Sequence, residues 1–465
     1  MRPLFPANLI SSPVLNNLNH MSKSVLSRFG AALILLSKAS GSVASASATR
    51  AGRLSFARAN SASLLVRGGA TFSATEEDGF EAPSTLDPFG HLPEIEPSLL
   101  TVERTKCPRE KQDKSTLVFG QTFTDHMLHC DWDSERGWHT PKIAPYGDLT
   151  INPAASSLHY ALQCFEGMKA YRDAEGNVRL FRPDLNISRL NKSLARLHFP
   201  MVDEASFLEL VSKLILEDAD WIPEGDGYSL YVRPTAVSTH GFLGVHPAQS
   251  IKLFVILSPV GPYYKEGFKP IRLFADTVNR RAWPGGMGFA KAGGNYAPTI
   301  LPQVKAQEEH ECAQVLWLFG DEHYVTEVGA MNIFFVMEKE GGGGIELITS
   351  PLEAGDILDG VTRRSVLELA REWQTLDGKA TLEVSERRLT MGEVVRSAKE
   401  GRLLEVFGTG TAAVIAPVKA IKYMGEDIQV VPSGEKIGPL AKRFWDSITD
   451  IQYGRVEHPW SIRIS

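Results

Sequence analysis

Cysteine is scarce in this sequence of 465 residues, and its four cysteines form no C-x-x-C pair and lie beside no histidines at metal-ligand spacing. They are Cys107, Cys130, Cys164 and Cys312. This scatter argues against a disulfide framework and gives no indication of a metal site. A reducing compartment is the simpler interpretation.

The chain also lacks an excess of positive charge, since its formal net charge is -6 at pH 7. A nucleic-acid-binding protein normally carries a basic surface, so nucleic acid is not the expected partner. The apolar run AALILL at 31–36 is too short to cross a bilayer. We therefore expect small-molecule substrates, and neither nucleic acid nor a membrane as a partner.

Aspartate and glutamate are absent from the first 75 residues, where eight arginines and lysines stand among many serines and alanines. This composition is typical of an organelle transit peptide. We expect mitochondrial targeting, with a plastid as the alternative, and assign residues 1–100 to the transit peptide and a leader outside the fold. A disordered tail without a targeting role is the other interpretation.

Downstream of the leader, β-branched and aromatic runs alternate with segments of helical periodicity. The predicted strands are residues 229–238, 251–260, 313–320, 332–338, 345–350 and 402–408. The predicted helices are residues 203–221, 361–373 and 436–452. The expected fold class is therefore α/β or α+β.

A stretch rich in proline and glycine at 258–270 divides the globular part of the chain. We expect a small N-terminal α/β domain at 101–264 and a larger C-terminal domain at 265–465. The tract EGGGG at 340–344 is predicted to be a hairpin loop, because predicted strands flank it.

One lysine, Lys291, stands among five glycines and no other charge in GGMGFAKAGGNYAP at 285–298. A lysine amine is a useful nucleophile only when it is partly neutral and faces an electrophile with room around it, and glycines supply that room. A surface loop is the ordinary alternative. The segment does not match the phosphate-binding pattern G-x-x-x-x-G-K-[ST], because Ala292 follows the lysine.

Three further stretches contain groups that a catalytic site would need. The single acid Glu327 lies at the end of a strand, and the helix predicted from residue 361 begins after a glycine, so the N–H groups of Val361 and Thr362 are free for an anion. The small-residue turn at 408–413 carries two threonine hydroxyls. Each stretch alone also fits a surface acid, a simple helix start or a turn.

The turn at 408–413 matches G-x-G-x-x-A as well, which is close to the dinucleotide fingerprint of a Rossmann oxidoreductase. That fingerprint requires a long helix directly after the glycines, and Pro417 disfavours one. The following residues, VKAIKYMGEDIQVV, have the character of a hairpin instead.

Seven stretches taken together resemble the branched-chain amino acid aminotransferases of the eukaryotic type. They are SSLHYALQCFEGMKAY, RLFRPDLNISRL, SLYVRP, GGNYAPT, QVLWLFG, TEVGAMNIF and EVFGTGTA. The resemblance runs from about residue 117 to about residue 454, in the family's order. It implies a two-domain fold of type IV of the pyridoxal 5′-phosphate enzymes, with this cofactor at the domain interface and in the larger C-terminal domain.

The resemblance also implies roles for individual residues toward the cofactor. Lys291 would bond covalently to the cofactor aldehyde and then move the substrate Cα proton as general base and acid. Glu327 would face the pyridine nitrogen and keep it protonated, and Tyr296 would hydrogen-bond the ring oxygen. Phosphate contacts are implied for Arg189, Arg281, Val361, Thr362 and Thr411.

The implied reaction is the reversible transfer of the amino group of L-Leu, L-Ile or L-Val to 2-oxoglutarate in a ping-pong cycle. Arg233, with Tyr160 nearby, would bind the glutamate γ-carboxylate, and the backbone at Thr411 and Ala412 the α-carboxylate. In this family a homodimer completes the active sites. The apolar pocket walls are implied to be Phe119, Tyr160, Phe165, Tyr231 and Tyr263.

The sequence departs from the family pattern at two places. Ala413 and Ala416 stand where the animal enzymes have a C-x-x-C, so a thiol redox switch is not expected there. Ala330 replaces a threonine found in many eukaryotic relatives, which puts one hydrogen bond near the cofactor ring in doubt.

Two other classes of function stay open. Lys291 and Glu327 would also serve another fold type IV chemistry, such as D-amino acid transamination or a lyase reaction, although the pocket aromatics and Arg233 argue against it. A module on this scaffold without enzymatic activity is the other class, and the presence of both Lys291 and Glu327 argues against that.

Overall fold

The computed structural model describes residues 87–263, 267–373, 381–430 and 436–465. The predicted transit peptide lies outside the described residues. The last part of the predicted leader does not, because Ile95 is 3% exposed and packs in the core of the first sheet. The described fold therefore begins before residue 101.

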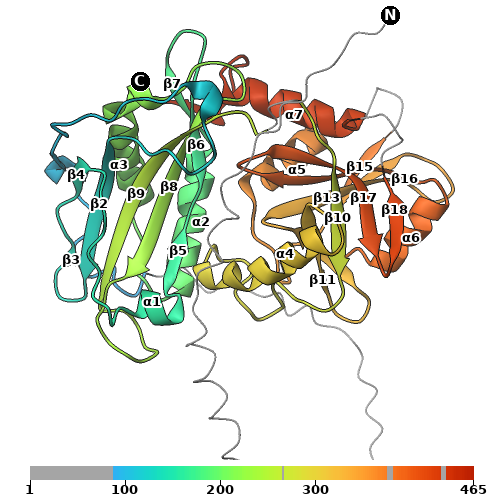
Figure 1. The fold of residues 1–465 in the computed structure, drawn as a ribbon, viewed down its shortest axis with the longest axis horizontal. Helices are drawn as coiled ribbons and strands as arrows, with labels where there is room; N and C mark the ends of the chain where they lie inside the picture. Colours follow the sequence, from blue (N-terminus) through green and yellow to red (C-terminus); the bar gives the residue numbers. More distant parts are fainter. Residues whose placement is uncertain (1–86, 264–266, 374–380, 431–435) are drawn as a thin grey trace, which may run out of the picture. The chain divides into compact units, whose positions relative to one another are not determined.

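The strands of the described residues form two sheets (Figure 1). The first has the order β1-β4-β2-β9-β8-β6-β7-β19, with β3 on β2 and β5 on β8. The predicted strands at 229–238 and 251–260 are confirmed as β8 and β9, which pair antiparallel along their length. The strands of this sheet are β1 (Thr101–Val102), β2 (His126–Asp133), β3 (Gly137–Trp138), β4 (Lys142–Pro145), β5 (Gln163–Phe165), β6 (Met168–Arg172), β7 (Val178–Phe181), β8 (Ser229–Ser238), β9 (Ser250–Val260) and β19 (Ser461–Arg463).

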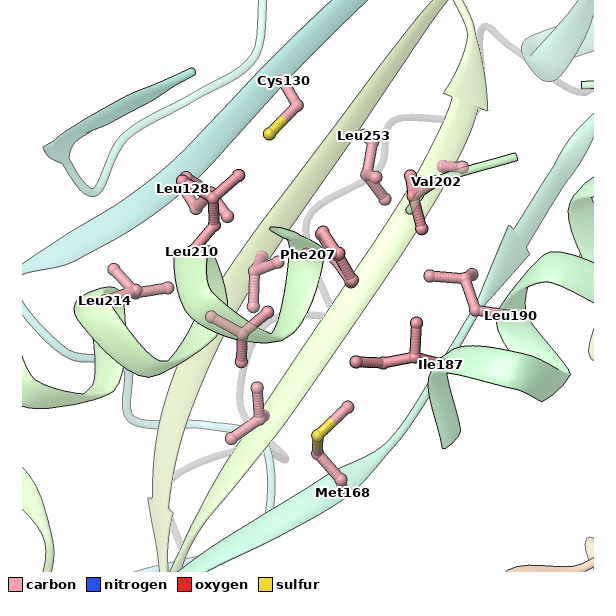
Figure 2. Close-up of a cluster of buried hydrophobic side chains, with 14 of the residues drawn as sticks. Leu128, Cys130, Met168, Ile187, Leu190, Val202, Phe207, Leu210, Leu214 and Leu253 are labelled. Carbon is pink, nitrogen blue, oxygen red and sulfur yellow. The ribbon is translucent and has the colours of Figure 1, made fainter. Parts of the chain in front are cut away.

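Two helices, α2 (Pro183–Arg196) and α3 (Glu204–Glu217), pack their apolar side chains against this sheet. Figure 2 shows Leu210 and Leu214 of α3 and Ile187 of α2 turned toward the strands. These residues recur at helical spacing and bury one stripe of each helix, which is the main stabilising term for such a helix.

The helix predicted at 203–221 is shorter in the structure than its periodicity suggested. Asp203 caps its start by accepting from the N–H of Ser206 at 2.8 Å. α3 ends at Glu217, the side chain of the next residue, Asp218, accepts from the N–H of His126 at 2.9 Å, and a 3-10 turn at Ala219–Trp221 follows.

The second sheet has the order β12-β11-β10-β17-β16-β13-β14-β15, with β18 on β17. An additional pairing joins β12 to β13, so β12, β11, β10, β17, β16 and β13 form a closed ring, which removes the exposed edges. The strands are β10 (Ile271–Asp276), β11 (Gln314–Phe319), β12 (Tyr324–Val328), β13 (Met331–Glu338), β14 (Ile345–Thr349), β15 (Leu382–Glu386), β16 (Leu403–Gly410), β17 (Val414–Tyr423) and β18 (Glu426–Gln429).

Most predicted elements of the second half are confirmed. β13 and β14 pair antiparallel around the predicted EGGGG hairpin loop. β17 and β18 also form a hairpin, directly after the small-residue turn. A strand therefore follows the G-x-G-x-x-A match, which rules out the Rossmann interpretation of that match.

The helices of the second half lie on the closed ring and beside it (Figure 1). The predicted helix at 361–373 is confirmed as α5, whereas that at 436–452 begins only at Pro439, where proline suits the first helical position. After α7, β19 returns to pair with β7 of the first sheet. The remaining helices are α1 (Ser156–Tyr160), α4 (Ile300–Glu308), α5 (Val361–Trp373), α6 (Met391–Lys399) and α7 (Pro439–Gln452).

Candidate active site

The backbone of Lys291 is attached to elements of the first sheet. Its N–H donates to the Oγ of Ser193 in α2 at 2.9 Å, and its carbonyl accepts from the N–H of Phe165 in β5 at 3.1 Å. The next residue, Ala292, forms a β-bridge with Cys164. The glycine-rich segment is therefore not a free surface loop, because it is bonded to two other elements.

Close packing explains two of the glycines around this lysine. A Cβ on Gly288 would lie 2.9 Å from the Cα of Asp356, and a Cβ on Gly293 would lie 2.7 Å from the side-chain nitrogen of Gln163. Real Cβ atoms do not approach other atoms so closely without displacing them. Other parts of the chain therefore pack directly against this backbone.

The Lys291 amine lies among aromatic rings. Its Nζ donates to the hydroxyl of Tyr296 at 3.3 Å, and it lies 5.0 Å from the ring centroid of Phe165 and 5.5 Å from that of Tyr296. Aromatic faces attract a cation, while the half-buried position limits its contact with water. The predicted lysine and tyrosine are thus brought together as one unit.

The carboxylate of Glu327 is almost fully buried at the end of β12. Its Oε1 accepts from Asn332 Nδ2 at 3.1 Å and from the N–H of Leu358 at 3.2 Å, while its Oε2 forms an ion pair with Arg281. Burial raises the pKa of Glu327, and the charges of Arg281 and Lys291 oppose that rise. The predicted acid therefore has two cationic neighbours and two hydrogen-bond donors.

These contacts bear on two details of the sequence prediction. The position of Ala330 leaves Glu327 without a threonine donor, and the Leu358 N–H and the Asn332 amide take that role. The resemblance implied Arg281 near the phosphate end of the cofactor, yet its guanidinium here pairs with Glu327. A phosphate contact of Arg281 stays a prediction.

Arg189 of α2 is held by a carboxylate that the sequence analysis did not single out. Its Nε and Nη2 donate to Glu166 at 2.7 and 2.9 Å, and its Nη1 donates to the carbonyl of Asp359 at 2.8 Å. Asn186 Nδ2 also donates to Glu166 at 2.8 Å. Burial would raise the pKa of Glu166, but the guanidinium outweighs it and the pKa is lowered. Arg189 is thereby fixed in one orientation.

The start of α5 lies beside this arginine. Arg189, Asp359 and Val361 line a small cavity of about 30 Å³, and Val361 and Thr362 are both buried. The first N–H groups of a helix have no acceptor within the helix, so they offer donors to an anion. The structure thus places three of the predicted phosphate-binding residues in one region.

A continuous aromatic wall runs up to Lys291. The rings of Phe119 and Tyr231 meet edge to face at 4.8 Å, and the Arg233 Nη2 donates to the Tyr231 hydroxyl at 3.0 Å. The same guanidinium lies 4.8 Å above the ring of Phe165, which in turn contacts the ring of Tyr296 at 5.0 Å. The wall combines apolar surface with the guanidinium of Arg233.

The other predicted substrate residues are Tyr263, Ala412, Thr411 and Tyr160. Tyr263 and Ala412 line a cavity of about 730 Å³ together with Phe119, and the Thr411 hydroxyl donates to the Gly167 carbonyl at 3.3 Å. Tyr160, the last residue of α1, is 40% exposed and packs beside His159. The contacts described for Tyr160 do not join it to the aromatic wall.

Two features of the described residues complete the picture of the site. They contain no cluster of three or more histidine, cysteine or acidic side chains suited to hold a metal. Among the helices of these residues, none has both the length and the apolar character needed to span a membrane.

The sequence analysis missed four residues that hold this site together. Glu166 and Lys169 flank a glycine in CFEGMKAY, and a charged residue inside an otherwise apolar strand segment is a signal of a buried pair. Asn186 and Asn332 gave no such signal, because a single amide is as common in loops as in active sites.

The fold and the site together define a class of protein. A half-buried lysine, a buried acid and donors suited to an anion are combined on two sheets, and the family model described as "Amino-transferase class IV" matches residues 163–421. The chain resembles the branched-chain-amino-acid aminotransferase of Monosiga brevicollis, with 51% identity over 80% of this chain and 93% of that protein. The chain thus belongs to the family of branched-chain-amino-acid aminotransferases.

Further comparisons agree with this assignment. The mitochondrial branched-chain-amino-acid aminotransferase of Saccharomyces cerevisiae is 49% identical over 79% of this chain and 93% of its own length. Among solved structures, the branched-chain amino acid aminotransferase of Escherichia coli has a TM-score of 0.58 at 25% identity, covering 73% of this chain and 99% of that chain. The branched-chain amino acid aminotransferase of Thermobaculum terrenum in its PLP-form is similar in fold, with a TM-score of 0.57 at 22% identity, covering 74% of this chain and 100% of that chain.

Proposed function

We propose that this chain transfers the amino group of L-leucine, L-isoleucine or L-valine to 2-oxoglutarate, reversibly and in two half-reactions, with pyridoxal 5′-phosphate as cofactor. The observation that carries the proposal is the Lys291 amine, 3.3 Å from the Tyr296 hydroxyl and close enough to the buried Glu327 to act on its pKa. An amine that can lose and regain a proton beside a buried acid is what transamination requires.

The side chains present suit this cofactor. Lys291 supplies the amine for its aldehyde, Glu327 a carboxylate for its pyridine nitrogen, and Arg189 with the start of α5 supplies donors for its phosphate. The buried donors without a hydrogen-bond partner among the described residues include the Nε of Arg281 and the hydroxyl of Thr409. Buried polar atoms without partners are uncommon, and here they fit a polar ligand.

Each residue then has a task in the reaction. When bound, the cofactor supplies a ring that accepts electrons from the substrate Cα. The Nζ of Lys291 takes the proton from the substrate Cα in the first half-reaction and returns a proton to Cα of the new amino acid in the second. The Tyr296 hydroxyl orients that amine. Glu327 holds a fixed negative charge in a buried site, where that charge acts more strongly than it would in water. Arg189, held in one orientation by Glu166, would bind the phosphate of the cofactor.

The aromatic wall accounts for two kinds of substrate side chain. Phe119, Phe165 and Tyr231 offer apolar surface, and burying each methylene of a branched chain contributes about 0.8 kcal/mol. A glutamate side chain instead requires a cation, and Arg233 lies against the same rings with its Nε buried and, within the described residues, without a partner. One pocket can therefore take either side chain.

A homodimer is part of the proposal. Several large apolar side chains are exposed, and they would mark an interface where they form a contiguous patch. Sedimentation velocity should give twice the mass of one chain. The exposed apolar residues are Leu158, Tyr160, Phe242, Leu243, Trp283, Ile300 and Leu301.

Mitochondrial targeting is proposed as well, supported by the acid-free first 75 residues and by the mitochondrial relative from Saccharomyces cerevisiae, while another relative from that yeast is cytosolic. Residues 1–100 fused to a fluorescent reporter should direct it to mitochondria. A plastid destination would support the alternative, and a cytosolic one would contradict both.

An amino-donor panel tests the reaction. The protein reconstituted with pyridoxal 5′-phosphate is given 2-oxoglutarate and L-Leu, L-Ile, L-Val, D-Ala or L-Asp, and glutamate is measured. The three branched-chain donors should be fastest, Lys291→Ala should abolish turnover, and initial-rate plots should give the parallel lines of a ping-pong cycle. Fastest turnover of D-Ala would replace this function by another type IV chemistry.

A further inference from the structure

Lys169 of β6 is a buried lysine to which the proposed mechanism assigns no task. It is 9% exposed, and among the described residues no carboxylate forms an ion pair with it. Lysines are almost never so buried without a partner. Burial lowers the pKa of Lys169 to about 8. Because burying a lysine ammonium is energetically unfavourable, we expect Lys169 to have a role beyond packing.

The strand register turns Lys169 toward the aromatic wall. Lys169 is the cross-strand partner of Tyr231, whereas its neighbours Met168 and Ala170 lie in the hydrophobic core of the first sheet. Paired residues of antiparallel strands share one face, and so do residues two apart along a strand. Lys169, Tyr231 and Arg233 therefore project from the same face of the sheet.

The ammonium of Lys169 is bonded to the turn between β16 and β17. Its Nζ donates to the carbonyl of Ala412 at 2.9 Å, while Thr411 of the same turn donates to the carbonyl of Gly167. Gly167 and Lys169 of one short segment are thus hydrogen-bonded to the consecutive turn residues Thr411 and Ala412. Because a peptide unit is planar, a fixed Ala412 carbonyl also fixes the direction of the Ala413 N–H group, and with Thr411 bonded as well it restricts the backbone on both sides of Ala412.

The same two residues lie where two cavities meet. Lys169 and Ala412 both line the cavity of about 730 Å³ that Phe119 and Tyr263 also line, and both line a second cavity of about 270 Å³. The turn is therefore not supported by close packing from every side. The turn is held by the hydrogen bond from the charged Lys169 and by that of Thr411.

We propose that Lys169 is a positioning residue that orients the Thr411–Ala412 turn to receive the α-carboxylate common to all substrates. This rests on the proposed function and on the expectation, implied by the family resemblance of the sequence, that this turn binds the α-carboxylate. Lys169 then sets the affinity for every amino acid and 2-oxo acid alike, whereas Arg233 concerns the glutamate side chain only.

A pair of ligands separates this role from a purely structural one. 4-Methylvaleric acid is leucine without its amino group, and 4-methylvaleramide has the same chain without the charge. Both are titrated into the reconstituted holoenzyme by calorimetry. Lys169→Met should weaken binding of the acid about tenfold, as expected when a charged hydrogen bond is lost, and leave the amide unchanged. Lys169→Arg, which keeps a charged donor, should restore most of the binding of the acid.

Steady-state kinetics should also distinguish a positioning role of Lys169 from a purely structural one. In Lys169→Met the KM values for L-leucine and for 2-oxoglutarate should both rise about tenfold, with kcat changed about twofold at most. Lys269→Met is the matched control, because Lys269 is an exposed lysine that lines the same large cavity, and its values should stay at those of the wild type. The visible absorbance of the bound cofactor should be the same in all variants.

Three results would overturn the proposal. Equal loss of acid and amide binding, loss of cofactor absorbance with unchanged KM values, or unaltered acid binding would each assign Lys169 a structural role. If Lys169→Met does not fold, Lys169→Gln decides, since its amide is one bond too short for Ala412 but suits a polar cavity. Failure of the wild type to use branched-chain donors would contradict the proposed function instead.

Discussion

The guanidinium of Arg281 and the carboxylate of Glu327 form an ion pair in which both side chains are at most 3% exposed. Burial raises the pKa of Glu327, and the positive charge of Arg281 keeps that rise in check. The two residues lie 46 positions apart (327 − 281 = 46) in a loop and a strand. The ionised form of Glu327 therefore depends on Arg281.

Glu327→Gln should both destabilise the protein and slow it. Arg281 would be left as a buried charge without its partner, which costs roughly 3–5 kcal/mol in the free energy of unfolding. The fixed negative charge would be lost from the site, so kcat for L-leucine should fall by about a hundredfold or more. Urea unfolding and steady-state kinetics measure the two effects.

Glu383→Gln is the control for this change. Glu383 is an exposed acid that pairs with Lys339 on the second sheet, and such a surface pair contributes about 0–1 kcal/mol. Similar losses of stability in both variants would show that burial of the Arg281–Glu327 pair has no special energetic role.

Glu166→Gln tests whether Arg189 needs its carboxylate. The pKa of Glu166 is lowered in the folded protein, so the ionised form stabilises the fold above the ordinary pKa, and this contribution is lost as the pH falls below about 4.5. The wild type should be more stable than the variant at pH 7, and the difference should shrink below that pH. Unfolding in urea over a pH series gives both values, and a difference independent of pH would contradict the ion pair.

Much of the fold could be predicted, because local patterns decide it. The alternation in β8 and β9, the helical stripe of α5 and the glycines between β13 and β14 each require a particular local structure. Element ends were less predictable. α3 ends where Asp218 binds His126, 92 residues away in the sequence, and no local pattern contains that contact.

The residues of the active site could likewise be predicted only in part. Lys291 and Glu327 stood out because a lone charge among glycines or strand residues is unusual. The residues that hold them did not, since Arg189 meets the Asp359 carbonyl across 170 positions and Lys169 meets Ala412 across 243. Such contacts depend on how the two sheets meet, which a single sequence does not display.

Gly167→Ala should disturb the aromatic wall. An added Cβ would lie 1.9 Å from the Tyr231 hydroxyl, so this ring must move and its bond to Arg233 must lengthen or break. Overpacking of this kind costs roughly 1–3 kcal/mol of stability. Because Arg233 is the proposed partner of the glutamate side chain, KM should rise more for glutamate than for L-leucine.

A double-mutant cycle makes this test specific. In a Tyr231→Phe background the hydroxyl that clashes is gone, so Gly167→Ala should cost less there than in the wild type. Gly147→Ala is the control, because the space around that glycine is open within 4 Å. Equal costs in both backgrounds would show that the clash is with something other than the hydroxyl.

The four cysteines should differ sharply in their reactivity toward a thiol reagent. Cys107 is exposed, whereas Cys130, Cys164 and Cys312 are buried, and burial raises the pKa of all three thiols, that of Cys130 to about 12. Only the thiolate reacts, so at pH 8 one thiol per chain should react in the native protein and all four after unfolding. Cys107→Ser should abolish the native reaction. Full activity should persist after modification, since no C-x-x-C follows the turn at Thr411. Fast reaction of a second thiol with loss of turnover would instead identify Cys164, next to the Lys291 segment, as accessible from the site.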